Sequence, residues 1–207
     1  MSNTTTPTNE TVKVITPVHF YKGFDFAVGK PSNNYDPIFF KPLTCEAVTV
    51  CTDRFRIFTT KDAFGCNSFS NEAGDVDIMR VIPTTFISIF WVSFEYKQIK
   101  AMKAMIELAK SYNLDFNASY ITTDGDKMTI KVCDDLEGST MQATLTMDIV
   151  NDCPDVYTYK VNLLYVYEFL NFLFKNKLST RSIEFKTNAK SLLLEAFDFI
   201  YSIAILN

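Results

Sequence analysis

The spacing of hydrophobic residues divides the chain near residue 93. Before this point, β-branched and aromatic residues gather in short runs typical of strands, at residues 14–20, 24–28, 47–51, 55–59, 76–82 and 86–92. Turn-forming stretches such as residues 29–34 separate these runs. No part of this half shows the apolar period of an amphipathic helix. The pattern therefore predicts a β-rich region over residues 12–92.

Residues 93–112 predict the first helix. Ser93 can cap its start, and on a helical projection an apolar arc faces a polar one. The apolar arc holds Ile99, Met102, Met105, Ile106 and Ala109, and the polar arc holds Lys100, Lys103, Glu107 and Lys110. We therefore expect one buried face and one exposed, mostly basic face.

The segment DGDKMTIKVCDD (residues 124–135) predicts a β-hairpin rather than a metal site. Asp124-Gly125 lies between two strand-like runs, and glycine accepts the positive φ of a tight turn. An EF-hand loop beginning at Asp124 fails, because its fifth and sixth positions are Met128 and Thr129. Asp134 and Asp135 would lie about 15–20 Å from the turn along an extended strand. We therefore interpret these aspartates as turn and loop residues.

The rest of the chain predicts a second helix among strands. A strand at residues 141–150 ends at the break in residues 151–154, and Asn162 can cap a helix from residue 163 to about 177. Leu163, Val166, Tyr167, Leu170, Leu173 and Phe174 share one side of this helix, with a thin polar line at Glu168, Asn171 and Lys175. Strands are expected at residues 182–186, 191–197 and 199–206, and no exact internal repeat is visible. This order predicts an α+β fold with both helices on one face of an antiparallel sheet.

Composition narrows the class of protein. Apolar residues make up 47% of the 207 residues, which is enough for a packed core, while the Thr/Asn-rich residues 1–11 are expected to form a mobile tail. These first residues lack the features of a signal peptide, and no stretch is long and apolar enough to span a membrane. The net charge of −4 means that any binding of nucleic acid must come from a local basic stripe.

The residues that usually carry chemistry are sparse. Five cysteines without a C-x-x-C pair and a single histidine, His19, favour reduced thiols in a cytoplasmic compartment and argue against zinc or another cofactor. His19 stands near no nucleophile pattern, so a structural role is favoured over catalysis. With six scattered glycines there is no phosphate-binding loop. The sequence therefore gives little support to an enzyme.

The second half resembles one domain of the DNA sliding clamps, the ring-shaped factors that make polymerases processive. The resemblance lies in QIKAMKAMIELAK followed by ASYITTDGDKMTIKVCDD, and in YKVNLLYVYEFLNF and RSIEFKTNAKSLLLEAFDFIYSIAIL near the end. It covers residues 93–207 and implies a clamp-like α+β domain there. Clamp chains carry two or three such domains and rings contain six, so two domains would imply a homotrimer. Residues 12–92 are short for a clamp domain and are either a reduced copy or an unrelated β module.

The resemblance also implies a site. A sliding ring holds phosphates without reading bases, and lysine suits that task. The residues that would face duplex DNA are Lys97, Lys100, Lys103, Lys110, Lys175 and Lys177. The alternative is an ordinary solvated helix face, in which Glu107 pairs with Lys103. The aromatic run from Phe86 to Trp91 is either a buried strand or, as in clamps, part of the apolar pocket where partner peptides dock.

Two hypotheses for function remain open from the sequence. The first is a sliding-clamp-like, DNA-associated processivity factor that tethers a DNA or RNA polymerase to duplex DNA, acting as a homo-oligomer. The second is a non-enzymatic structural or interaction protein, such as a viral one, whose β-rich half forms an assembly surface. Both place the protein in the cytoplasm or inside a host cell.

Overall fold

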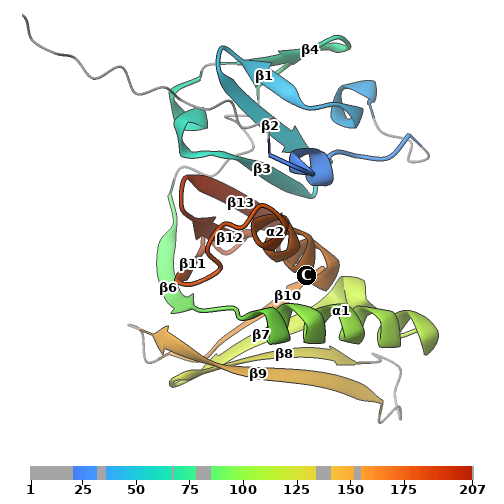
Figure 1. Ribbon diagram of the computed structural model, residues 1–207, viewed down its shortest axis with the longest axis vertical. Coiled ribbons are helices and arrows are strands. Elements are labelled where there is room, and N and C mark those ends of the chain that lie inside the picture. Colours follow the sequence, from blue (N-terminus) through green and yellow to red (C-terminus); the bar gives the residue numbers. More distant parts are fainter. Residues whose placement is uncertain are drawn as a thin grey trace, which may run out of the picture.

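The structure is a computed structural model that describes residues 21–31, 36–66, 68–77, 85–133, 141–151 and 155–206. The expected tail, His19, the strand at 14–20, most of the strand at 76–82, and Asp134 and Asp135 lie outside the described residues. The described strands form one antiparallel sheet in the order β10-β7-β8-β9-β6-β11-β12-β13-β3-β2-β1-β4-β5. Figure 1 shows this sheet running from the upper region to the lower one.

The second half consists of two copies of one strand-helix-strand-strand-strand unit. The first copy is β6 (Ile87–Val92), α1 (Tyr96–Ser111), β7 (Ser119–Asp124), β8 (Lys127–Cys133) and β9 (Gln142–Asn151), with the short 3-10 helix η6 (Phe116–Ala118). The second is β10 (Tyr157–Val161), α2 (Leu163–Lys175), β11 (Ile183–Thr187), β12 (Ser191–Ala196) and β13 (Phe199–Ala204). The first strand of each unit pairs with the second strand of the other, β6 with β11 and β10 with β7. The structure therefore contains an internal repeat that the sequence does not reveal.

The sheet bends at β6, and both helices lie in the angle of this bend. Figure 1 shows α1 along β7, β8 and β9, and α2 beside β11, β12 and β13. The two helices also contact each other. The predicted α+β fold, with two helices on one face of an antiparallel sheet, is therefore confirmed.

The first half extends the same sheet. It contributes β1 (Leu43–Cys45), β2 (Val48–Thr52), β3 (Arg56–Thr60), β4 (Phe69–Asn71) and β5 (Gly74–Val76). Its described helices are the 3-10 helices η2 (Phe24–Ala27), η3 (Pro37–Phe40) and η4 (Lys61–Gly65). Strand β3 pairs with β13 over five residues, so the two halves share one sheet. The strands predicted at 47–51, 55–59 and 86–92 are confirmed as β2, β3 and β6, whereas β1 and β4 were not foreseen.

The strand predicted at residues 24–28 is wrong. Gly23 adopts a left-handed conformation with φ 73°, and the chain then forms the 3-10 helix η2 instead of extending. This turn directs Phe24 and Phe26 toward Phe58, with ring centroids 4.8 and 4.7 Å away. Packing with rings from distant parts of the chain outweighs the local β propensity of the segment.

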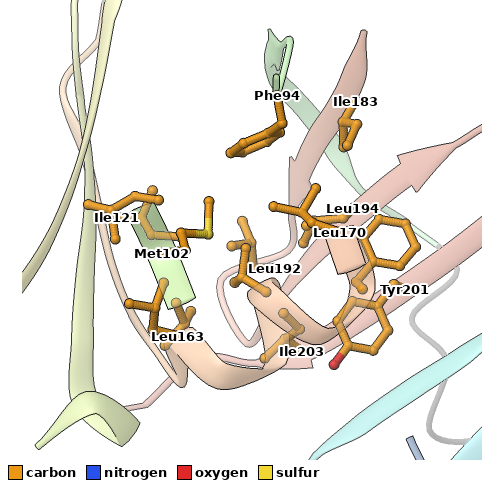
Figure 2. Close-up of a cluster of buried hydrophobic side chains, with 14 of the residues drawn as sticks. Phe94, Met102, Ile121, Leu163, Leu170, Ile183, Leu192, Leu194, Tyr201 and Ile203 are labelled. Carbon is orange, nitrogen blue, oxygen red and sulfur yellow. The ribbon is translucent and has the colours of Figure 1, made fainter. Parts of the chain in front are cut away.

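Two hydrophobic clusters hold the molecule together. The larger one contains α1, α2 and their strands, and it also takes in Phe24, Cys51 and Phe58 from the first half. Figure 2 shows Met102 of α1 beside Ile121 of β7, with Leu170 of α2 close to Leu192 and Leu194 of β12. The smaller cluster contains Ile38, Leu43, Val50, Ile57, Ala63 and Phe69. The domain boundary between residues 92 and 93 stays a prediction. The larger cluster includes side chains from both sides of it, so the hydrophobic core does not divide the chain at this point.

Helix α1 begins two residues later than the sequence predicted. The capping residue is Glu95 rather than Ser93, and the Glu95 backbone N–H donates to Oε1 of Gln98 at 2.7 Å. Phe94 is buried, and its N–H donates to the carbonyl of Thr180 at 2.9 Å. This tertiary hydrogen bond holds the preceding residues out of the helix.

The other local predictions in this half are confirmed. Strands β7 and β8 form the expected hairpin, in which Asp124 pairs with Lys127 around Gly125, whose φ is 57°. The side chain of Asn162 accepts a hydrogen bond from the Leu164 N–H at 3.0 Å and caps α2. The strands expected at 141–150, 182–186, 191–197 and 199–206 are β9, β11, β12 and β13. The strand β10, which begins the second unit, was missed.

A buried arginine links the two halves. Arg56 of β3 is only 8% exposed, and its Nε lies 2.9 Å from Oδ2 of Asp53. Its Nη1 binds the carboxylate of Glu168 on α2, and its Nη2 donates to the carbonyl of Phe26 at 2.9 Å. The guanidinium also stacks 4.1 Å from the ring centroid of Tyr165. One side chain therefore joins β3, η2 and α2.

Electrostatics keep this arginine charged despite its burial. Burial by itself would lower the pKa of Arg56, but the Tyr201 hydroxyl, which accepts a hydrogen bond from Nη1, and the carboxylates of Glu168 and Asp53 raise it above the ordinary value. Burial also raises the pKa of Tyr201, so this phenol stays protonated beside the guanidinium. The guanidinium of Arg56 therefore stays charged, and its hydrogen-bonding and ion-pair partners surround it.

Replacing Arg56 tests how much this network stabilises the fold. Arg56→Leu would leave Asp53 buried without its cation, so we expect the free energy of unfolding to fall by about 3–5 kcal/mol. Chemical denaturation measures the change. The matched control is Lys41→Leu, which removes an exposed ion pair with Glu72 and should change stability little. Equal shifts in the two variants would contradict a special role for Arg56.

Candidate nucleic-acid interface

Helix α1 has the two faces that its sequence predicts. Its buried residues are Ile99, Met102, Met105, Ile106 and Ala109, which is the predicted apolar arc. Lys97, Lys100, Lys103, Glu107 and Lys110 are exposed. The apolar face packs on β7–β9 and α2, so the basic face is turned away from the sheet.

A groove between α1 and α2 collects three of the six predicted lysines. Its lining consists of Tyr96, Ile99, Lys100 and Lys103 from α1, and Tyr167, Asn171, Phe174 and Lys175 from α2, around a volume of about 380 Å³. Lysines more than 70 residues apart in the sequence therefore face one cavity. None of the lining residues is acidic, so the groove favours an anion.

Stacked aromatic rings join the two helices beside this groove. The rings of Tyr96 and Phe174 are nearly parallel, at 11°, with centroids 4.6 Å apart. The ammonium of Lys100 lies 4.6 Å from the centroid of the Tyr96 ring, close enough for a cation–π contact. The stack fixes the spacing of the helices, and the cation–π contact places Lys100 at the groove.

The other predicted lysines have different surroundings. Lys97 is exposed and lies 2.9 Å from the carboxylate of Glu95, whose hydrogen bond raises the pKa of Lys97. The ammonium of Lys110 lies 5.4 Å from the Phe116 ring, at the far end of α1. Lys177 is exposed beyond the end of α2. These three lysines do not line the groove.

Of the three lysines that line the groove, only one lies close to an acidic side chain that offsets its charge. Lys103 is 3.5 Å from Glu107, the i,i+4 pair expected from the sequence. Within the part of the chain that the structure describes, Lys100 and Lys175 form no ion pair. On α2, Glu168 binds Arg56, so its charge is compensated by the first half of the protein. The basic character of the groove is therefore stronger than the sequence of α2 indicates.

The sequence missed the aromatic part of this site. The sequence pattern places Tyr167 and Phe174 on the apolar side of the second helix, but Phe174 is 42% exposed, whereas Phe172 is buried. Phe172 packs against Tyr21, Phe26 and Phe58 of the first half, with the Phe58 centroid 4.8 Å away. This distant contact sets which aromatic residues of α2 are buried. The only local signal was Tyr96, one helical turn before Lys100.

The aromatic run before α1 is only partly buried. Ile89, Phe90 and Val92 belong to the core, as a buried strand requires, but Ile87 is 71% exposed. Ile87 lines an apolar pocket of about 570 Å³ with Thr85, Phe86, Tyr157, Tyr159, Thr187, Asn188 and Ala189. The pocket lies where the beginnings of β6 and β10 approach the turn between β11 and β12.

The described residues offer neither a metal site nor an activated thiol. No group of three His, Cys, Asp or Glu residues there could hold a metal ion. Cys45, Cys51, Cys66 and Cys133 are free thiols, whereas Cys153 lies outside the described residues. Burial raises the pKa of Cys51, and burial together with a hydrogen bond to Cys45 raises the pKa of Cys66 to about 11. Among the described helices, none is long and apolar enough to cross a bilayer.

The raised pKa of Cys66 predicts slow alkylation. With a pKa of about 11 instead of 9.0, its thiolate fraction near neutral pH is about 100-fold smaller. We expect iodoacetamide to modify Cys66 far more slowly in the native protein than in the urea-unfolded chain, with a rate that rises with pH. Mass spectrometry of each cysteine gives the rates. Equal rates in native and unfolded protein would contradict this prediction.

The arrangement of helices, sheet and internal repeat is that of a known fold class. Comparison with solved structures shows that this chain has the fold of the DNA sliding clamps, in agreement with the resemblance in its sequence. The match to the DNA polymerase III subunit beta of Pseudomonas aeruginosa has a TM-score of 0.63 and 11% identity, and covers 88% of this chain and 62% of that one. The match to the Caulobacter crescentus pol III beta has a TM-score of 0.63 and 13% identity, and covers 92% and 64%.

A further match involves a clamp with a bound partner. The Helicobacter pylori beta clamp bound to a DNA ligase peptide aligns with a TM-score of 0.52 and 15% identity, over 77% of this chain and 53% of that one. No protein-family model matches the sequence, and no curated protein matches it significantly. The alignment with the Pseudomonas clamp covers more of the chain than residues 93–207 alone, so the likeness reaches into the first half. This chain spans slightly less than two thirds of the length of the clamps from Pseudomonas and Caulobacter.

Proposed function

We propose that this protein is a sliding-clamp-like, DNA-associated processivity factor without enzymatic activity of its own. One observation carries the proposal. In a chain with the sliding-clamp fold, Lys100, Lys103 and Lys175 line a groove between the two helices, and no acidic residue lines it. The lysines favour binding of a polyanion at this face. The net charge of −4 means that the rest of the surface repels a polyanion.

The contacts would be independent of DNA sequence. Lysine ammonium groups on flexible stems bind phosphates as point charges and do not read base edges. Lys97, Lys110 and Lys177 would extend the contact beyond the groove to the rest of the helix face. Such a surface holds duplex DNA and still allows it to slide.

We propose an oligomeric ring, or a fragment of one, as the assembly that serves this function. Residues 12–92 would be a reduced clamp domain and residues 93–207 a full one, so three copies would supply six domains. The pairing of β13 with β3 supports this idea, because it already continues the sheet from one region into the next. We propose a homotrimer that encloses the duplex in the cytoplasm of a cell or infected host.

The tethered partner would be a DNA polymerase or an RNA polymerase. Clamps bind partner peptides, as the Helicobacter pylori clamp binds a peptide of DNA ligase. The apolar pocket beside Ile87 is the candidate docking place on this chain, because it combines an exposed aliphatic residue with the rings of Tyr157 and Tyr159. Such a tether could serve DNA replication or transcription.

DNA binding should depend steeply on salt and on the groove lysines. We expect a triple variant, Lys100→Glu, Lys103→Glu and Lys175→Glu, to bind duplex DNA much more weakly than the wild type. The slope of log K against log salt should become shallower by roughly 2.7, since about 0.9 counterions are released per phosphate contact. Fluorescence anisotropy with a labelled duplex measures both quantities.

A lysine on the exposed face of the sheet provides the control. Lys127 on β8 is exposed, pairs with Asp148 and lies away from the helices, so Lys127→Glu should leave affinity and slope nearly unchanged. If the triple variant and this control bind equally, the helix face is not the DNA interface.

Ring formation can be measured directly. We expect size-exclusion chromatography with light scattering to give the mass of three chains, about 71 kDa, or three times the 23.6 kDa of one chain. A monomer at micromolar concentration, with or without DNA, would rule out a closed ring of this protein alone.

A structural or interaction protein is the second candidate, and the exposed apolar side chains of Ile87, Val150 and Val156 favour it. This function predicts assembly through those residues without salt-dependent binding of DNA. The lysine variants would then be indistinguishable from the wild type in every assay.

A further inference from the structure

The groove between α1 and α2 contains more apolar surface than a contact with duplex phosphates requires. Tyr96 and Phe174 are 49% and 42% exposed although their rings stack on each other. Tyr167 and Asn171 are half-buried beside them, and the same cavity is lined by Ile99. Large aromatic side chains exposed together at a surface usually mark a binding site.

The charges around these rings select the kind of ligand. Lys100 and Lys103 stand on one side and Lys175 on the other, with no acidic residue in the lining. A purely apolar partner would not need these cations, and a purely ionic partner would not need the rings. The ligand that matches both is a polyanion that also presents flat aromatic groups.

A duplex meets only half of this description. Its bases are stacked and paired, so a protein groove next to its backbone reaches phosphates and sugars but no base face. In an unpaired strand, each base offers a π-face to an aromatic side chain while the phosphates follow the basic groove. A volume of about 380 Å³ falls within the roughly 300–1,000 Å³ typical of small-ligand pockets, so one nucleotide can enter.

The ammonium of Lys100 can leave the Tyr96 ring and so make room for such a base. Its ammonium lies 4.6 Å from the Tyr96 ring centroid at the end of a flexible four-carbon stem. When a base approaches the Tyr96–Phe174 pair, this ammonium can move to the adjoining phosphate. The side chain would exchange a cation–π contact for a charge-assisted one.

We propose that this groove is a binding site for an unpaired DNA strand, in which a base stacks on the Tyr96–Phe174 pair and Lys100, Lys103 and Lys175 hold the flanking phosphates. The inference rests on the proposed DNA-binding function and adds a second form of DNA to it. It assigns Tyr96 and Phe174 as the residues that distinguish an unpaired strand from a duplex.

The test compares two DNA probes with two kinds of variant of the full chain. The probes are a labelled oligothymidylate of about 20 nucleotides, longer than the site of one binding fold, and a duplex of the same length. Tyr96→Leu with Phe174→Leu keeps apolar bulk but removes both π-faces. We expect this double variant to bind the single strand about 5- to 100-fold more weakly, the loss typical of one stacked base, while duplex affinity changes less than about two-fold.

The control variant separates stacking from charge. Lys100→Gln with Lys175→Gln should weaken binding of both probes and make both salt slopes shallower. If the aromatic variant weakens both probes equally or neither, or if the wild type does not bind the single strand, the inference is overturned. If the wild type binds only the single strand, and loses it in the aromatic variant, the inference stands and the duplex function fails.

A second measurement does not depend on the fold of any variant. Irradiation of the wild-type protein with a strand that carries 5-iodouracil forms covalent bonds to aromatic side chains that stack on the base. Mass spectrometry of the cross-linked peptide should identify Tyr96 or Phe174. Cross-links confined to aromatic residues outside the groove, such as Tyr157 or Tyr159, would overturn the proposal.

Discussion

The position of α2 depends on one buried cation. Arg56 lies in β3 of the first half, and its guanidinium binds Glu168 on α2, Asp53 beside it and the carbonyl of Phe26. A charge with so little access to water is tolerated only when its partners surround it, so these partners must stay together. The network, together with the packing of Phe172 on Phe26 and Phe58, therefore fixes the rotation of α2 about its own axis. That rotation decides that Phe172 faces the core and that Asn171, Phe174 and Lys175 face the groove.

The same pairing shapes the electrostatics of the groove. Glu168 is the acidic member of the polar line on α2, and without Arg56 it would lie beside the lysines with an uncompensated charge. Because Arg56 binds it, the field at the helix face is set mainly by Lys100, Lys103 and Lys175. A protein with net charge −4 can then present a positive surface at one place. The first half of the chain thus stabilises the fold and also sets the charge of a surface built by the second half.

The two repeated units explain why the secondary structure of the second half was easier to predict from the sequence than that of the first half. In the second half, each unit contains a long amphipathic helix whose period is strong enough to identify it locally, and the glycine and asparagine signals at Gly125 and Asn162 mark turns and caps correctly. The repeat itself cannot be detected in the sequence. It consists in how the strands of the two units pair with each other, and many different sequences can form the same strand pairs. In the first half, the five-residue strands β2 and β3 can be recognised, whereas the three-residue strands and the 3-10 helices contain too few residues to show a period. The segment from Phe24 to Ala27 reads as a strand for this reason, although ring packing makes it helical.

The sequence alone determined the class of the fold, from the order of its elements. It also determined the two faces of α1, the cap of α2 and the candidate lysines, because each of these follows from residues within a few turns of one another. Only the tertiary structure decided that Lys100, Lys103 and Lys175 share one groove with a stacked Tyr96–Phe174 pair, while Lys97, Lys110 and Lys177 do not line it. It also decided that Glu168 is compensated and that α1 begins at Tyr96, through contacts with Arg56 and with the carbonyl of Thr180. The physical reason is the same in each case. A side chain's burial and charge are set by partners that lie more than 70 residues away in the chain, and no local pattern of residues records them.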